Sequence, residues 1–546
     1  MKFFLVFSAV LSSLAVPIPA AAADEAPARP ATLLPGLGSH RHPIRTASPE
    51  AQKFFDQGLT LLYGFNHDEA IRAFARAAEL GPDAAMPHWG IALALGSNYN
   101  DPEPAAERLK KAHEEVQKAL ALSAAGPANE RRYAEALALR YPADPAADKA
   151  RVAREYHDGM RALVKEYPDD LDAATLYAES GMNLNPWKLW KPDGTAAEGT
   201  EEIVATLESV LRRDPSHPGA NHYYIHAVEA SPDPARALPS AMRLPGLVSG
   251  AGHLVHMPAH IYMRTGDYLA AERANAEAAE VDRVYLRATG AQGMYPLAYY
   301  NHNLHFLSAA AAMAGRHAEA KKAAQELYAG VLPAVHEMQM LEGFLLQPLF
   351  VAVRFRQWDE IERTPDAGEK FPLLRAMRLY ARGVAAAAAG NVRKAETERK
   401  AFAAARAAVP PAALAGMLNA ASAVLDVAAN ALDARIAEAR GDRVAAVASW
   451  RKAVAAEDAL AYDEPAAWHY PVRESLGAAL LRDGRPEESE KIFREDLDRN
   501  PRNGRSLFGL AACLQAMKRP ADAAFVRERF DVAWKDADTK LRLEDL

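Results

Sequence analysis

The sequence predicts an all-α protein built from antiparallel helix hairpins that stack side by side. Three observations support this fold class. From Pro49 onward, almost every segment shows the apolar spacing of three and four residues that is typical of an amphipathic helix. Alanine is abundant and runs of β-branched residues are rare, which favours helix over strand. Short glycine-containing turns, for example Gly266-Asp267 and Gly441-Asp442, separate helix pairs of similar length.

The first 23 residues have the pattern of a cleaved secretory signal peptide. Lys2 is followed by an apolar run, and three small residues, Ala21-Ala22-Ala23, form the expected cleavage pattern. The apolar run contains two prolines and is shorter than the ~20 residues that cross a bilayer. We therefore expect a periplasmic or extracellular protein without a membrane span. Residues 24–48 are rich in proline, alanine and glycine without periodicity, which predicts a flexible leader.

Composition and missing motifs exclude several classes of function. The net charge is −7 and the chain has no large Lys/Arg cluster, so we expect no nucleic acid partner. Cys513 is the only cysteine, which excludes an intramolecular disulfide and any site with several thiolate ligands. A metal site must therefore use His, Asp, Glu or Met. The sequence has no nucleophile elbow, phosphate-binding loop, dinucleotide fingerprint or HExxH motif.

The helix pairs follow a 34-residue repeat that is clearest at Ala51–Ala84. There Gly58 is the eighth residue, Ala70 the twentieth, Phe74 the twenty-fourth and Pro82 the thirty-second. Small residues allow the two helices to approach closely, the aromatic ring fills the gap, and proline ends the second helix. The unit at 470–503 repeats this pattern with Gly477, Phe493 and Pro501.

This pattern resembles that of the tetratricopeptide repeat (TPR) family. The resemblance covers most of the chain beyond residue 48. It implies a right-handed superhelical solenoid whose concave face is lined mainly by the first helix of each hairpin. An insertion around Gly181–Glu201 predicts a loop, in which Trp187 and Trp190 either pack on the surface or form a lid over the groove. The expected segments are 49–200 with this insertion, a histidine-rich part at 201–330, divergent hairpins at 331–410 and C-terminal TPR hairpins at 411–546.

Histidines are concentrated near the middle of the chain. Seven of the 17 fall within the 84 residues from His222 to His305. They form three groups, namely His222 and His226, then His253, His256 and His260, then His302 and His305. Spacings of three and four residues place side chains on one face of a helix. This is how a helix supplies two imidazole ligands to one transition-metal ion.

The repeat phase places these histidines in a single groove. If Gly266 and Gly315 are the fifteenth residues of their units, the histidines occupy the second, fifth and ninth positions of first helices. In the TPR family those positions face the concave surface. Glu229 extends the first histidine group on the same face, and Glu179 takes a ninth position in a preceding unit.

We therefore expect a mono- or dinuclear metal site for which copper, iron and zinc are compatible ions. An open coordination position would permit catalysis, with Glu229 or Glu179 as a general base, whereas a closed site would store, deliver or sense metal. Pro258 interrupts the second histidine group. It predicts that the helix begins near Val255 and leaves His253 in the helix cap.

The alternative is a protein–protein interaction scaffold. In this reading a peptide or a partner protein fills the groove, and the histidines supply hydrogen bonds to it. The segments HLVHMPAH (253–260) and NHYYIHAVEAS (221–231) resemble a motif of secreted bacterial TPR proteins. That resemblance implies no particular activity, so the sequence leaves open whether the protein is an enzyme.

Overall fold

A computed structural model describes residues 31–144 and 146–546, so the expected signal peptide and the first part of the expected leader lie outside it. The described residues form consecutive helices without a β-strand. Neighbouring helices pair as hairpins, beginning with α1 (Pro49–Tyr63) and α2 (His67–Leu80). The prediction of an all-α, TPR-like helix-hairpin solenoid is confirmed. In the described part of the chain, no helix combines the length and the apolar character needed to cross a membrane.

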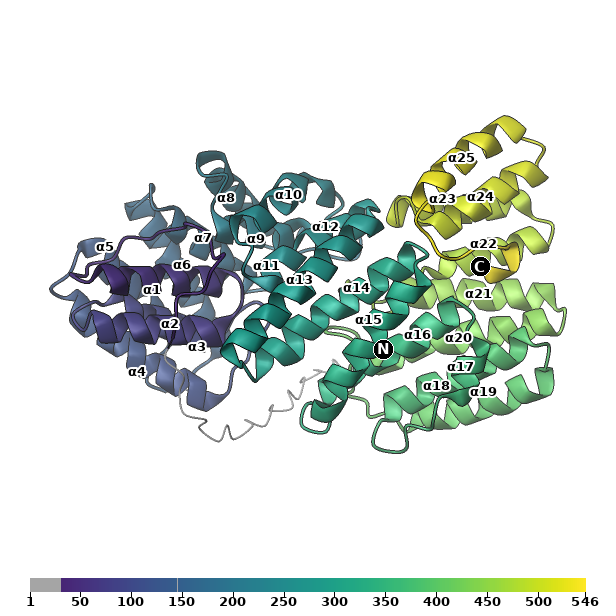
Figure 1. The fold of residues 1–546 in the computed structure, drawn as a ribbon, viewed down its shortest axis with the longest axis horizontal. Coiled ribbons are helices and arrows are strands. Elements are labelled where there is room, and N and C mark those ends of the chain that lie inside the picture. The colour runs from purple at the N-terminus through teal and green to yellow at the C-terminus, as the bar shows by residue number, and fades with distance from the viewer. Residues whose placement is uncertain (1–30, 145) are drawn as a thin grey trace, which may run out of the picture.

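In Figure 1, α1 to α13 lie on one side of the molecule, α16 to α25 on the other, and α14 and α15 between them. The first part continues with α3 (Met86–Leu95), α4 (Ala106–Ser123), α5 (Ala128–Arg140), α6 (Lys149–Glu166), α7 (Leu171–Met182), α8 (Thr200–Arg213), α9 (Pro218–Val228), α10 (Leu238–Leu247), α11 (Gly252–His256), α12 (Pro258–Thr265) and α13 (Tyr268–Thr289).

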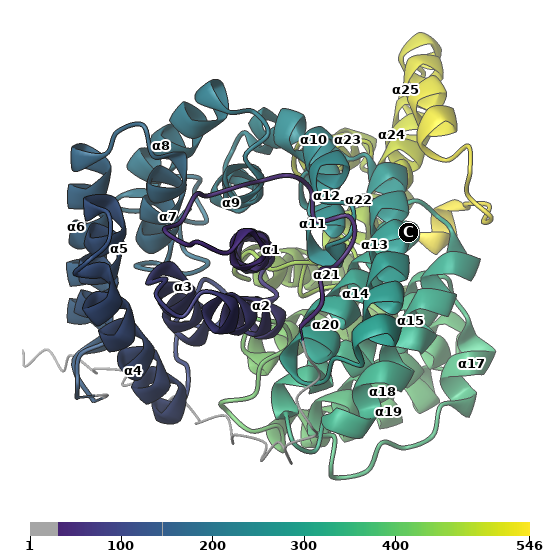
Figure 2. The ribbon, with the colours of Figure 1, turned by 60° about the vertical axis from the view of Figure 1, so that its left-hand side comes forward.

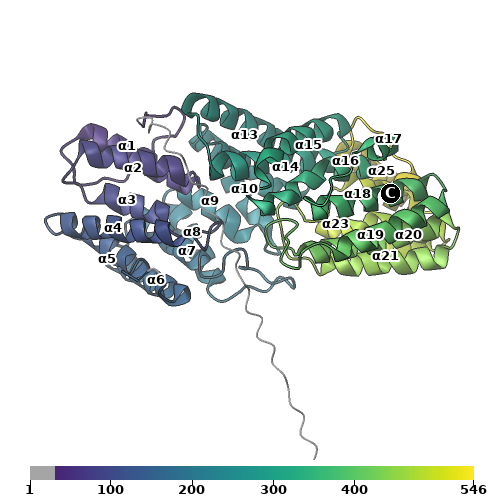
Figure 3. The same cartoon turned by 90° about the horizontal axis from the view of Figure 1, so that it is seen from below.

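The second part begins with a short π-helical turn at Tyr295–Tyr300, which leads directly into α14. Its α-helices are α14 (Asn301–Met313), α15 (His317–Val331), α16 (Gln347–Arg354), α17 (Trp358–Arg363), α18 (Pro372–Ala388), α19 (Val392–Ala407), α20 (Ala421–Ala439), α21 (Arg443–Asp458), α22 (Val472–Arg482), α23 (Pro486–Arg499), α24 (Gly504–Ala516) and α25 (Pro520–Ala533). Seen from below, α18 to α21 lie side by side (Figure 3).

Close packing of the hairpins depends on the small and aromatic residues of the repeat. A Cβ atom at Gly58 would lie 2.6 Å from the ring of Phe74, which is fully buried between the helices. Gly477 and Phe493 have the same relationship, again at 2.6 Å. A larger residue at either glycine would force the helices apart, because protein interiors have no spare volume of that size.

The histidine-bearing helices lie where two hydrophobic cores meet. The first core extends from α1 to α12 and contains Leu254 and Ile261. The second core includes Leu304 of α14 and continues through α22. Helix α1 lies inside the curve made by α3, α7 and α9 (Figure 2), so its C-terminal residue, Tyr63, reaches the first histidine group.

Residues 31–48, the described part of the expected flexible leader, form a segment without helix that packs against the hairpins; we call it the strap. Its Leu34 N–H donates to the Gln57 side chain of α1 at 2.7 Å. Farther along, the Gly250 N–H donates to the Gly36 carbonyl at 2.8 Å. Figure 2 shows the strap as a purple segment that passes over α1. Composition alone suggested flexibility because it does not reveal these distant partners.

The helix that carries the second histidine group begins earlier than expected. Helix α11 already starts at Gly252, and α12 starts at Pro258 after a break at Met257. The proline has no N–H to donate to the preceding turn, but this interrupts the helix for one residue only. The expected start near Val255 is therefore wrong, and His253 belongs to a helix rather than to its cap.

Candidate metal centre

Six of the seven predicted histidines come together in two adjacent sets of three. In each set, one ring nitrogen from each residue lies within 4.8 Å of the others. The first triad is His222, His226 and His253, and the second triad is His256, His260 and His302. The ring centroids of His226 and His260, which belong to different triads, are only 5.3 Å apart. The two triads therefore form one continuous centre.

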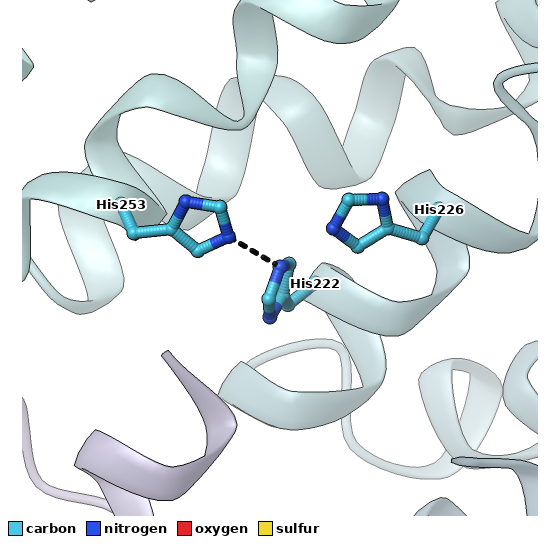
Figure 4. Close-up of side chains that lie close together, drawn as sticks. All are labelled: His222, His226 and His253. Carbon is cyan, nitrogen blue, oxygen red and sulfur yellow. Dashed lines mark hydrogen bonds between the residues drawn. The ribbon is translucent and has the colours of Figure 1, made fainter. Parts of the chain in front are cut away.

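The first triad combines two residues from α9 with one from α11. Its three rings face one another in Figure 4. The His222 Nδ1 atom contacts the Tyr63 carbonyl oxygen at 2.5 Å, and because that oxygen only accepts, Nδ1 carries the proton. The Nε2 atom of neutral His222 therefore has a free lone pair, and it lies 3.2 Å from Nε2 of His253. Two nitrogens bound to one tetrahedral metal ion at about 2.0–2.1 Å lie roughly 3.3 Å apart, close to this separation.

The second triad combines residues from α11, α12 and α14. Asn275 of α13 holds His256: its amide donates to the Ala271 carbonyl, which leaves Oδ1 to accept the His256 Nδ1–H at 2.6 Å. The Nε2 atom of His256 then lies 2.7 Å from Nε2 of His260. His302 packs against His256 with ring centroids 4.9 Å apart.

A single carboxylate joins the two triads. Glu229 follows α9, and its Oε1 atom accepts from Nδ1 of His226 at 2.9 Å. Its Oε2 atom accepts from Nδ1 of His260 at 2.6 Å. Both oxygens are thus used to orient imidazoles, and both rings direct Nε2 away from the carboxylate. This arrangement fits a positioning residue and disfavours the expected role of Glu229 as a general base.

A second carboxylate, Glu464, comes from the loop between α21 and α22, and the sequence reasoning missed it. It forms an ion pair with His260 and accepts a hydrogen bond from the Tyr462 hydroxyl. Ligand atoms of His226, Glu229, His260 and Glu464 lie within 4.8 Å of one another. Glu464 lies 204 residues after His260 in the sequence, so no helical spacing could have indicated it.

Burial keeps most of these imidazoles neutral. It lowers the pKa of His222, His253, His256 and His302 well below 6.5, and neighbouring histidines lower it further. Burial, with a smaller effect of His260, lowers the pKa of His226 to about 3. A neutral imidazole is the form that binds metal.

His260 differs from the other five histidines. Burial lowers its pKa, but the nearby carboxylates of Glu464 and Glu229 raise it more, to about 10. In turn, burial and the charge of Glu229 raise the pKa of Glu464 to about 7. Without a metal ion, the centre therefore holds a proton on His260 at neutral pH.

Two predicted residues, His305 and Glu179, lie outside both the triads and the carboxylates that join them. His305, one turn after His302 on α14, packs edge-on against Phe344 with ring centroids 5.2 Å apart. It joins none of the ligand groups in the described residues. Glu179 of α7 accepts from the Asn183 amide at 2.5 Å and joins none of them either.

A second polar cluster, also missed from sequence, fixes the strap. Asp172 of α7 contacts His40 and His42 of the strap, each at 2.9 Å, and accepts from the Tyr63 hydroxyl at 2.6 Å. His217 lies 3.2 Å from the same carboxylate. Burial raises the pKa of Asp172, but hydrogen bonds from the three histidines lower it more, to well below 3.8.

The role of His217 as a helix cap disfavours a metal ion in the Asp172 cluster. Its Nδ1 atom accepts the Ala220 N–H at the start of α9, at 3.1 Å. In neutral His217 the proton must therefore be on Nε2, which faces Asp172. A metal ion at Nε2 would move that proton to Nδ1 and break the cap, so hydrogen bonding accounts for this cluster.

A cavity of about 490 Å³ opens beside the triads. Four triad histidines, His226, His253, His260 and His302, line it together with residues from the second half of the chain. Trp187, in the loop between α7 and α8, also lines it, as expected for a lid residue, with its ring centroid 5.8 Å from that of His226. Trp190 instead packs behind, where its indole N–H donates to the Ala227 carbonyl at 2.7 Å.

Neither a protein-family model nor a curated protein matches this chain. Among solved structures, the human IFIT1 dimer with m7Gppp-AAAA is 14% identical, with 90% of this chain and 92% of that chain covered and a TM-score of 0.31. Yeast Tom70 is 11% identical, with 90% and 93% covered and a TM-score of 0.28. Similarities this weak say nothing about the function of this chain, so the description of the fold and of the site is based on the structure alone.

Proposed function

We propose that the protein binds two transition-metal ions, one in each histidine triad, for metal-dependent catalysis or metal handling. The main support is the orientation of the rings. His222, His226, His256 and His260 each use Nδ1 for a hydrogen bond to an oxygen acceptor. Their Nε2 atoms are therefore the available ligands, and such bonds to the second ring nitrogen are typical of metal-binding histidines.

An orphaned nitrogen adds to this support. Nε2 of His226 is buried and has no hydrogen-bond partner among the described residues. Because its Nδ1 atom faces Glu229, Nε2 has an unused lone pair that points toward the other rings of the first triad. A metal ion would satisfy this lone pair, whereas a purely hydrogen-bonded network leaves it unpaired.

The donor set favours copper, zinc or iron. Each triad offers three imidazoles, which suit all three ions, and no thiolate is available. Cys513, the single cysteine, is buried in α24 beside Ser489. Glu464 adds a carboxylate at the edge of the second triad. Export to the periplasm or beyond remains part of the proposal, because the expected signal peptide lies outside the described residues.

The alternative, a groove that binds a peptide through histidine hydrogen bonds, has less support. Five of the six triad histidines are buried, with at most 2% of their surface exposed. A peptide on the concave surface would find almost none of their side-chain surface exposed for hydrogen bonding. A protein partner would have to bind through other residues of the solenoid.

Metal stoichiometry tests the proposal. The untagged protein is loaded separately with copper, iron and zinc, dialysed, and analysed for bound metal. We expect about two equivalents of at least one metal, and about one equivalent after either His222→Ala or His256→Ala. The control variant His305→Ala, outside both triads, should keep both ions. Substoichiometric binding of all three metals would contradict the proposal.

A further inference from the structure

We propose that the cavity beside the triads binds a small, uncharged aromatic molecule that carries a hydroxyl group, as in a phenol. This inference rests on the proposed metal centre, because the cavity places such a molecule against the triads. Its volume of about 490 Å³ falls within the roughly 300–1,000 Å³ of known small-molecule sites.

The cavity gives direct access to the centre. Four of the six triad histidines line it, and the unpartnered Nε2 atom of His226 belongs to one of them. The remaining two, His222 and His256, lie behind and are fully buried. A molecule in the cavity would therefore meet both triads from one side, as a substrate or ligand of a metal ion must.

Aromatic side chains form the walls next to the triads. Phe65 stacks on His253 with ring centroids 5.5 Å apart, and Tyr299 meets the same imidazole edge-on at 5.0 Å. Phe306 lies 5.0 Å from His302. Farther from the centre the lining continues with Phe344, Phe350 and Trp468. Such walls favour a flat ring, which can stack on them or meet them edge-on.

The charges of the lining argue against an anion. Each arginine that lines the cavity is already engaged by an acceptor of the protein. The pairs are Arg108 with Asp101, Arg264 with the Glu229 carbonyl, Arg354 with Glu474, and Arg499 with Asp458. A carboxylate or phosphate would find no unpaired arginine here, so only a metal ion in the triads could compensate for its lost hydration.

The lining also offers little to a cation. Burial raises the pKa of the Glu457 carboxyl to about 8, so this group is largely neutral at pH 7. Asp101 is paired with Arg108, and Glu464 is paired with His260. Apart from the metal ions, the lining therefore suits an uncharged molecule better than an ion of either sign.

His305 supplies a polar contact for the hydroxyl group. Its Nδ1 atom is buried and has no hydrogen-bond partner among the described residues, and the side chain lines the cavity. Burial lowers its pKa to about 4, which keeps the ring neutral. A neutral ring nitrogen next to Phe344 can exchange a hydrogen bond with a ligand hydroxyl whose ring stacks on the aromatic wall.

The test compares 2-naphthol with 2-naphthoate, which has the same rings but a charged carboxylate. Binding is measured by calorimetry, first to the metal-free protein, in which no metal ion can hold the carboxylate, and then to the metal-loaded protein. We expect one 2-naphthol per protein in both forms, and about tenfold weaker binding of 2-naphthoate to the metal-free form. Equal affinity of the metal-free protein for the two compounds, or no binding of 2-naphthol by fully metal-loaded protein, would overturn the inference.

A cavity-filling variant locates the binding site. Ala309 of α14 lines the cavity, and Ala309→Phe should weaken 2-naphthol binding about tenfold or more by occupying its space. Ala318→Phe, at an exposed position of α15, is the matched control. Metal content and circular dichroism of both variants confirm folding. If the Ala309→Phe variant folds, keeps its metal and binds 2-naphthol with unchanged affinity, 2-naphthol does not bind in the cavity and the inference is wrong.

The same experiment separates the two proposals. If the protein binds two metal ions but does not bind 2-naphthol, the proposed metal centre is supported and the proposed aromatic ligand is contradicted. If the protein binds no metal, the proposed metal centre is contradicted. Binding of 2-naphthol that Ala309→Phe weakens would then support an aromatic site without a metal centre.

Discussion

The Nε2 atoms of His256 and His260 lie 2.7 Å apart, although each ring already uses Nδ1 for a hydrogen bond to an oxygen. Two lone pairs cannot face each other at this distance unless a cation lies between or beside them. A proton on His260 can fill this role, as its pKa of about 10 indicates. A metal ion would take the place of that proton, so the geometry predicts competition between metal and proton.

Metal binding to the second triad should release a proton. At pH 7 His260 is protonated without metal and must lose that proton to bind through Nε2. We expect calorimetric titrations in buffers of different ionisation enthalpy to show about one proton released in wild type but not in His260→Ala. The apparent affinity of the second triad for metal should increase with pH up to about pH 10. Metal binding without proton release would contradict this protonation state.

Removing the charge that joins the triads should weaken metal binding. In Glu229→Gln the amide NH2 group replaces one of the two acceptor oxygens. One of the two imidazole N–H groups therefore loses its acceptor. We expect metal affinity to fall about 10- to 100-fold, as for other residues that orient metal-binding histidines. Competition with a chelator measures this change. Glu179→Gln, at a buried glutamate outside the centre, should leave affinity unchanged; equal effects of both variants would show that the loss is not specific.

Acid should destabilise the metal-free protein through His226. Its pKa is about 3 in the folded protein and near 6.5 when unfolded, so the unfolded chain binds a proton more readily. The free energy of unfolding has the full contribution of neutral His226 above about pH 6.5 and loses this contribution as the pH falls toward 3. Between pH 7 and 5 it should lower the free energy of unfolding by up to about 2 kcal/mol.

Urea unfolding of wild type and His226→Gln at the two pH values isolates this contribution from those of other titrating groups. The wild type should lose more stability than the variant on acidification. His336→Ala, at an exposed histidine, should behave as wild type. Parallel losses in wild type and His226→Gln would show that His226 titrates normally.

Weakening the Asp172 cluster should loosen the strap. Asp172→Asn replaces one acceptor oxygen by an amide that faces donors from the surrounding histidines and Tyr63. We expect the free energy of unfolding to fall by about 2–4 kcal/mol and trypsin to cleave faster after Arg41 and Arg45. The exposed neighbour Asp169→Asn serves as the control. Unchanged cleavage would mean that other contacts fix the strap.

Tyr63 lets the two clusters be tested separately. Its hydroxyl donates to Asp172, whereas its backbone carbonyl accepts from His222. Tyr63→Phe removes the first bond and keeps the second, so stability should fall by about 1 kcal/mol while metal stoichiometry stays the same. Denaturant unfolding and elemental analysis together check this. Loss of metal in Tyr63→Phe would show that the Asp172 cluster also supports the centre.

Sequence reasoning recovered the features that depend on local spacing. The glycine and aromatic positions of the repeat predicted the hairpins, because Gly58 and Phe74 act within one helix pair. Helical spacing also identified six histidines that the structure brings together. It failed for His305, which lies three positions after His302 but packs against Phe344 and joins neither triad.

Features that depend on distant packing were not predictable in the same way. Glu464 reaches His260 from a loop in the second half of the chain, and Asn275 reaches His256 on α11 from α13. The strap depends on Asp172, which lies 130 residues from His42. Neither repeat phase nor residue spacing connects such pairs before the fold is known.

Anomalous X-ray diffraction from crystals of metal-loaded protein, collected at the absorption edge of the bound metal, would locate the ions themselves. The structure predicts two peaks, one among the Nε2 atoms of His222, His226 and His253 and one among those of His256, His260 and His302. Peaks elsewhere, for example beside Asp172, or no peak within either triad of fully loaded protein, would contradict the proposed centre.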